Sequence, residues 1–220
     1  MTLAALKEKS TYKTLGEQLR YSLYCIFHPA DGFWCITRER RASVASANIL
    51  LILCAVVNVL RLTLTNFQFV LVNIEYFNAI SSALSIAVPI ILWSVANWGF
   101  TALFDGKGKL SDIYIATVYA FTPSLILNAV CIPLSHFITY NEGVLYRVAL
   151  TIAMIWSVML LVVAMMQVHD YTMIKTILFG LLSIAGIGLI LFIFMLFFSL
   201  ISDAVVFFIG LANEIIFRLY

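Results

Sequence analysis

Charged residues are scarce in this chain. Only 11% of its 220 residues are Asp, Glu, Lys or Arg, while 63% are hydrophobic. A soluble domain of ordinary composition has about 25% charged and about 45–50% apolar residues. A water-soluble core of this length could not hide so much apolar surface, which excludes an ordinary soluble domain. Lipid must therefore surround much of the chain, and we expect one compact membrane domain.

Cysteine is also scarce, and its spacing excludes the common roles. Cys25, Cys35, Cys54 and Cys131 include no CxxC pair, and two of them fall in apolar blocks. We therefore expect neither zinc ligation nor a disulfide framework. The first long apolar block begins near Val44 with no small-residue cleavage site after it, so we expect it to remain as a signal anchor.

Motifs that carry chemistry are missing as well. No Asp or Glu lies near the middle of an expected span, where ion-coupled transporters usually place an ionisable group. The chain has neither an HExxH zinc motif nor a GxSxG nucleophile motif, and Gly106-Lys107-Gly108 lacks the spacing of a phosphate-binding P-loop. We predict no catalytic residue, no metal and no cofactor, and hence no enzyme.

The basic residues that are present are unevenly distributed. Seven of the thirteen Lys and Arg residues precede residue 42. Basic residues beside a first span are retained on the cytoplasmic side. We therefore expect a multi-pass protein of the cell membrane with a cytoplasmic N-terminus, an odd number of spans and a C-terminus outside. The net charge of +2 is too small to indicate a nucleic-acid partner.

The chain divides into three expected parts. Residues 1–41 form a cytoplasmic amphipathic head, residues 42–202 a membrane domain of five helices, and residues 203–220 a C-terminal interfacial helix. The sequence alone leaves open whether residues 203–220 span the membrane or lie on it. The predicted fold class is all-α, a bundle of five transmembrane helices with interfacial helices at both termini.

Within the head, two helical segments are expected. Apolar residues recur at helical spacing up to Phe27, and His28-Pro29 ends this helix because the residue before a proline avoids the helical region. Asp31 is expected to cap a second segment, residues 32–41.

Five apolar blocks are long enough to cross a bilayer. We expect them at about residues 44–64, 80–104, 112–138, 144–167 and 174–200. The third contains Pro123 and Pro133, so we expect it to be kinked or broken.

Two groups of residues are candidates for function. Aromatic anchors followed by a basic cluster suit a contact with lipid headgroups or a partner, and these residues are Phe33, Trp34, Arg38, Arg40 and Arg41. The second group is an intramembrane polar site of Asn97, Pro123 and Asn128. The amide of Asn128 could bond carbonyls freed by the prolines, a neighbouring helix or a ligand, and Asn97 suits helix packing near an interface.

Short motifs along the chain resemble those of a known family. They are Phe27-His28-Pro29, Gly32-Phe33-Trp34, Trp98-Gly99, Gly106-Lys107-Gly108 with Ser111, Tyr-Ala-Phe-Thr-Pro at 119–123, Trp156, and His169 with Lys175. Their order and the five-span layout resemble the Yip domain family, named for Ypt-interacting proteins, in its bacterial-type form. The resemblance covers roughly residues 20–200.

The resemblance implies a cytoplasmic N-terminus, five membrane helices and no established catalytic residue. Eukaryotic members are implicated in vesicle trafficking and contact prenylated Rab GTPases, and they carry an Asp-Leu-Tyr-Gly-Pro type motif in the head. This chain has Pro-Ala-Asp-Gly-Phe-Trp at 29–34 instead, so a Rab-type GTPase partner is not expected. Some bacterial-type members resemble accessory proteins of sugar-uptake permeases.

Three functions remain open. The leading hypothesis is a non-enzymatic scaffold or accessory protein whose head binds membrane lipid, a permease-type membrane complex or a second copy of the chain. The alternative is a small transporter or channel that uses the Pro-broken third helix. A weaker alternative is a membrane-embedded lipid enzyme with His136 and Arg147 around one outer cavity.

Overall fold

The computed structural model describes residues 3–69, 77–104, 106–139 and 142–219. The elements within these ranges are helices: α1 (Leu3–Phe27), α2 (Pro29–Arg38), α3 (Val44–Leu64), α4 (Ala79–Leu103), α5 (Leu110–Ala120), α6 (Thr122–Phe137), α7 (Gly143–His169) and α8 (Met173–Leu219). Five stretches, with α5 and α6 taken together, are long and apolar enough to cross a membrane. The prediction of an all-α polytopic membrane protein is confirmed.

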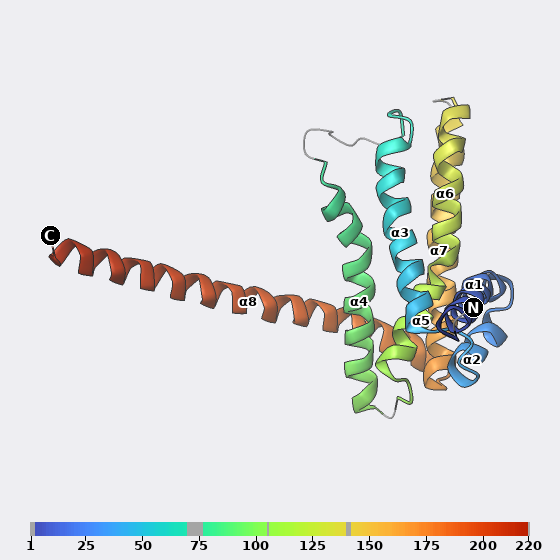
Figure 1. Cartoon of the computed structure of the whole chain (residues 1–220), viewed down its shortest axis with the longest axis horizontal. Helices are drawn as coiled ribbons and strands as arrows, with labels where there is room; N and C mark the ends of the chain where they lie inside the picture. The colour runs from blue at the N-terminus through green and yellow to red at the C-terminus, as the bar shows by residue number, and fades with distance from the viewer. Residues whose placement is uncertain (1–2, 70–76, 105, 140–141, 220) are drawn as a thin grey trace.

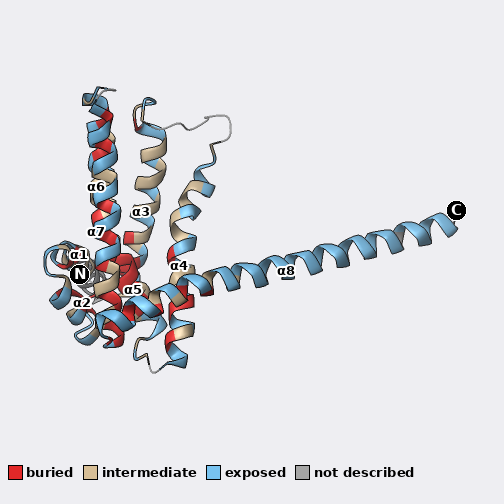
Figure 2. Ribbon diagram, turned by 180° about the vertical axis from the view of Figure 1, so that it is seen from behind, coloured by how far each residue is buried: buried red, intermediate tan, exposed pale blue. Residues whose placement is uncertain are grey.

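The upright helices α3, α4, α6 and α7 form a bundle with two ends (Figure 1). The end of α3, the start of α4, the end of α6 and the start of α7 lie at one end, which we call the far end. The head, the loop before α5 and the α7–α8 turn gather toward the other. We call it the basic end because it holds Arg38, Arg40, Arg41, Lys107, Lys109 and Lys175. Buried residues are concentrated around α5, near this end (Figure 2).

The third span is broken, as its prolines predict. α5 ends at Ala120, and α6 begins at Thr122 with Pro123 in its first turn. Proline is tolerated there because the backbone N–H groups of the first turn have no acceptor within the helix. Pro133, by contrast, lies inside α6 without ending it.

The head differs from the expectation at its second helix. α2 begins at Pro29 rather than at residue 32, because proline suits the first position of a helix. Asp31 therefore lies inside the first turn and does not cap α2. α2 packs against α7, and this contact carries Phe33 and Ile36 into the core.

The expected fifth span and the expected C-terminal helix form one continuous helix. α8 has 47 residues and no break at Asp203, since no proline occurs in this stretch. Its first part crosses α4 so closely that a Cβ on Gly186 would lie 2.1 Å from Cε2 of Phe100. From Leu191 onward every residue whose burial is described is exposed, and this part extends away from the bundle (Figure 1). An interfacial position for residues 203–220 stays a prediction.

Candidate functional site

One carboxylate joins three segments at the basic end. Asp170, between α7 and α8, accepts charge-assisted hydrogen bonds from Arg38 at the end of α2 and from Lys107 Nζ, the latter at 3.1 Å. These bonds from Arg38 and Lys107 hold the pKa of the Asp170 carboxyl below its usual range, and Asp170 in turn raises the pKa of Arg38. Because all three side chains reach solvent, we expect the pairs to orient the head more than to stabilise the fold.

The backbone of the α7–α8 turn places Asp170 for this role. Asp170 is the C-cap of α7 and adopts the left-handed conformation, with φ of 56°, which Asp and Asn tolerate better than other residues with a side chain. The next residue, Tyr171, donates a hydrogen bond to the Phe104 carbonyl at 2.9 Å. The turn is thereby bonded to the end of α4.

A buried chain of hydrogen bonds continues inward from these ion pairs. The N–H of Gly108 donates to Nδ1 of His169 at 3.4 Å, so Nε2 carries the proton and donates to Oδ1 of Asn97 at 3.0 Å. Nδ2 of Asn97 donates to Ser183 Oγ at 3.1 Å, and Ser183 donates to the Phe179 carbonyl. His169 and Asn97 are each 2% exposed. A neutral histidine with both ring nitrogens bonded is therefore compatible with burial.

The loop before α5 can take part only because residue 108 is glycine. A Cβ at Gly108 would lie 2.5 Å from Cγ1 of Val168 and 2.7 Å from Cε1 of His169, which is closer than real Cβ contacts. The close approach lets the Gly108 N–H reach the imidazole. We call this arrangement the basic-end junction, made of Arg38, Asn97, Lys107, Gly108, His169, Asp170 and Ser183.

The structure separates Phe33 from the other predicted contact residues of the head. Phe33 is fully buried in the core, so the prediction that it contacts lipid or a partner is wrong. The reason is that α2 packs on α7. A buried aromatic ring contributes far more free energy to folding than an exposed one, because its apolar surface is removed from water. The remaining four lie at the surface, fully or in part, namely Trp34, Arg38, Arg40 and Arg41.

The three residues of the predicted intramembrane polar site do not converge. Asn97 belongs to the basic-end junction, and Pro123 begins α6. Asn128 donates to the Ser124 carbonyl at 2.6 Å. Together with Asn58, whose amide also bonds a backbone carbonyl, Asn128 lines a separate cavity of about 50 Å³.

The residues considered for a lipid enzyme are not brought together either. His136 and Arg147 are both exposed, and no hydrogen bond or ion pair in the described part of the chain joins them. The ring of His136 instead interacts with Ser135 and with the carbonyl of its own helix at Ile132. Across the same described ranges, no group of three or more His, Cys, Asp or Glu residues could hold a metal ion.

Sequence reasoning missed Asp170 and Ser183, and it did not connect Asn97 with His169. One sequence signal could have indicated that Asn97 and His169 lie close together. Both residues are near the cytoplasmic ends of their expected spans, and thus at a similar depth in the membrane. Asp170 was the acidic residue in the polar turn on that side. Partner choice among these groups needed the tertiary structure.

The comparisons with known proteins assign the chain to a family. No curated protein and no solved structure matches the chain. A family model described as the Yip1 domain matches residues 23–212. The matched range contains every residue of the basic-end junction and all five candidate spans up to the last residues of α8. The chain therefore belongs to the Yip1 domain family.

Proposed function

We propose that this protein is a membrane scaffold or accessory protein that contacts lipid headgroups or a partner membrane complex through the surface of its head. Members of the Yip1 domain family are generally non-enzymatic membrane proteins, which supports a role without catalysis. The observation that carries the proposal is the fixed position of α2. Phe33 anchors it in the core, and Arg38 ties it to Asp170.

This anchoring gives the head a defined outer surface. Trp34 is 46% exposed, and Arg40 and Arg41 follow on the segment after α2. Exposed aromatic and basic side chains on one short segment suit a membrane interface or an acidic partner surface. A head whose position is fixed loses little conformational entropy when it binds.

The charge distribution supports a particular orientation. In the described part of the chain, most cationic side chains of the head and loops gather at the basic end, whereas Arg61 and Arg147 lie toward the far end. We propose that the basic end faces the cytoplasm of a cell-membrane protein and that the C-terminus lies outside, if α8 crosses once. Water-soluble thiol labelling of a single cysteine placed at residue 40 tests this in sealed vesicles.

The proposed partners are membrane lipid and either a permease-type complex or a second copy of this chain. A Rab-type GTPase is not proposed. Residues 29–34 lack the head motif of the eukaryotic members, and Phe33 within this segment is buried rather than available.

Photocrosslinking in native membranes tests the proposal. A photoreactive amino acid at position 34 should give lipid or protein adducts that the paired Arg40→Glu and Arg41→Glu substitutions reduce. The same probe at Phe137, which is 85% exposed toward the far end, is the control. Equal adducts at both positions, together with unchanged membrane complexes after deletion of the gene, would refute the scaffold role.

A small transporter or channel is the second candidate. The cavity lined by Asn58 and Asn128 lies beside Phe121, where the third span is broken, and broken helices often line binding sites. At about 50 Å³ it has room for water rather than for an organic solute. Liposomes should then show a flux that Asn128→Leu abolishes, and flux that persists in this variant would exclude the site.

A further inference from the structure

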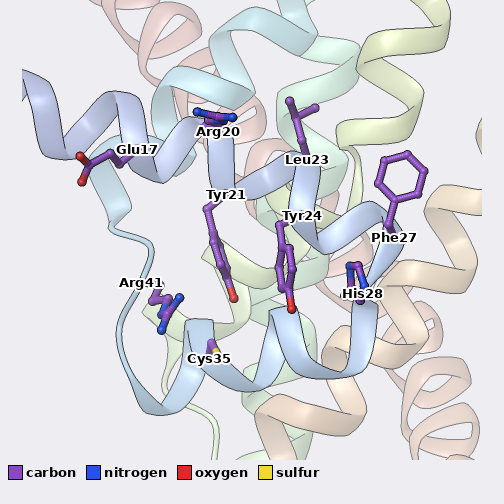
Figure 3. A pocket seen from close by; sticks show the side chains of 9 residues that line it. All are labelled: Glu17, Arg20, Tyr21, Leu23, Tyr24, Phe27, His28, Cys35 and Arg41. Atoms are coloured by element: carbon purple, nitrogen blue, oxygen red, sulfur yellow. The ribbon is translucent and has the colours of Figure 1, made fainter.

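The head contains an open cleft of about 830 Å³ between α1 and α2 (Figure 3). One wall is the α1 face that carries Tyr21, Tyr24 and the adjoining His28. The other is formed by Cys35 on α2 and by Arg41 beyond it. None of these belongs to the basic-end junction. Arg41 is the one lining residue that also belongs to the exposed head surface of Trp34, Arg38, Arg40 and Arg41.

Three rings form the α1 wall. The centroids of Tyr21 and Tyr24 are 5.4 Å apart, those of Tyr24 and His28 are 4.6 Å apart, and both pairs are stacked. Figure 3 shows the three side chains projecting in a row from α1 toward α2. Because the ring faces stack on one another, their edges, which carry positive partial charge, are left toward the cleft.

The hydrogen-bond donors of this wall are mostly unused. The Tyr21 hydroxyl donates to the Gly32 carbonyl at 3.3 Å. Tyr24 and His28 form no side-chain hydrogen bond within the described part of the chain, so the hydroxyl and the imidazole can donate to a ligand. Two donors beside positive ring edges favour a ligand with acceptor oxygens.

The guanidinium groups of the cleft provide donors for an anionic group of that ligand. Its lining carries two guanidinium groups, Arg20 and Arg41, against one carboxylate, Glu17. Arg41 lies 5.7 Å from the centre of the Tyr21 ring, and its Nε donates to Glu39 at 2.6 Å. The terminal nitrogens of Arg41 remain for an anion, and guanidinium groups bind phosphate oxygens well.

The cleft also has an apolar rim. Leu23 and Phe27 line it from α1 and are 46% and 74% exposed. An inorganic anion would gain nothing from these side chains, whereas a molecule with a phosphate and a hydrocarbon chain would use both parts of the cleft. α1 lies across the side of the bundle toward the basic end (Figure 1), where such molecules are available.

We infer that the cleft between α1 and α2 binds the phosphodiester headgroup of an anionic glycerophospholipid. The phosphodiester lies between Arg41 and the Tyr24 hydroxyl, and the adjoining acyl chain lies along Leu23 and Phe27. This inference rests on the proposed function in one respect, that the head faces a membrane surface. It adds a defined site and a lipid class.

Cys35 in the cleft provides the readout. Cys25 is fully buried, and burial raises the pKa of its thiol to about 12, so a water-soluble maleimide should not modify it. Cys35 is partly exposed. Cys54 and Cys131 lie in candidate spans, and a Cys35→Ser variant measures their background.

The experiment follows alkylation of Cys35 in the full chain in detergent micelles with short-chain phosphatidylglycerol. At about ten times the Kd of the lipid, alkylation should be roughly tenfold slower. Short-chain phosphatidylcholine and inorganic phosphate at equal concentrations should leave the rate unchanged. Equal protection by phosphate alone would overturn the lipid assignment, and an absence of protection by phosphatidylglycerol would overturn the site.

A matched pair of variants separates this site from general attraction to a basic surface. Arg41→Gln and Arg40→Gln remove one charge each from neighbouring positions, but only Arg41 lines the cleft. Protection should be lost in Arg41→Gln and kept in Arg40→Gln. Equal loss in both would overturn the cleft while leaving the photocrosslinking test of the proposed function at position 34 unaffected.

Discussion

At the basic end, segments from α2, α4, α7, α8 and the loop before α5 meet through ion pairs and buried hydrogen bonds. In the C-terminal half of α8, by contrast, the described side chains from Leu191 onward are all exposed. Both regions are helical and both lie within a chain rich in apolar residues. What distinguishes them is that polar groups buried inside the protein need specific partners, whereas exposed apolar groups on a membrane helix can be solvated by lipid.

The comparison teaches where structural specificity resides in this membrane protein. The position of the α7–α8 turn is set by hydrogen bonds that have few alternative partners. An apolar helix surface can pack on lipid, on another helix or on a second copy with similar energy. Substitutions should therefore be costly at the basic-end junction and nearly silent in the C-terminal half of α8.

The largest effect is expected from Gly108→Val. The added side chain would overlap Val168 and His169 and would remove the backbone donor from the imidazole. Overpacking and an unsatisfied buried group together should cost about 3–5 kcal/mol of unfolding free energy. The same substitution at Gly188, where a Cβ would meet nothing within 4 Å, is the control and should change the unfolding free energy by less than about 1 kcal/mol. Thermal unfolding in one detergent measures both, and equal losses would contradict the comparison.

The next largest effect is expected from Asn97→Leu. This change leaves the His169 Nε2–H without its acceptor, and a buried donor without a partner costs about 1–3 kcal/mol. Asn128→Leu is the matched substitution. Within the described residues, the Asn128 side chain bonds Ser124 of its own helix, so the loss there should be below about 1 kcal/mol. A ranking in the opposite order would show that the junction does not determine stability.

Asp170→Asn should have a smaller effect on stability, and this effect should depend on pH. Arg38 and Lys107 lower the folded-state pKa of Asp170 below its ordinary value of 3.8. The carboxylate therefore contributes stability above this value, and the contribution is lost as pH falls through the lower folded pKa. Asparagine retains the left-handed turn, so the variant should differ slightly from the native chain at pH 7 and converge with it as the pH falls below the lowered folded pKa of Asp170. A difference that grows on acidification would reverse the assigned sign.

The smallest effect is expected from removal of residues 204–220. This segment extends from the bundle (Figure 1), and the part of it whose burial is described is exposed throughout. The midpoint of thermal unfolding of the remaining chain should be unchanged within error. A marked loss of stability would mean that the segment contacts a second copy in the detergent-solubilised protein, which size measurements of both forms would detect.

Much of the fold could be predicted from the sequence because the determining forces are local. Hydropathy set the five candidate spans, and Pro123 predicted the break that separates α5 from α6. The order of short motifs indicated the family, while the bacterial-type form of that resemblance stays a prediction. The residues of the candidate site were harder to predict from the sequence. Phe33 and Trp34 are neighbours with similar chemistry but opposite burial, and only the packing of α2 on α7 distinguishes them.

The sequence by itself determined that the chain is an all-helical membrane protein with most of its cationic residues at one end. Length and hydropathy of each block are sufficient for this, since the bilayer requires internally bonded helices. Only the tertiary structure decided that Asn97, Gly108, His169 and Ser183 form one chain of hydrogen bonds and that Asp170 joins Arg38 to Lys107. These partners are separated by many residues, and their pairing depends on the depth and rotation of packed helices, which hydropathy does not encode.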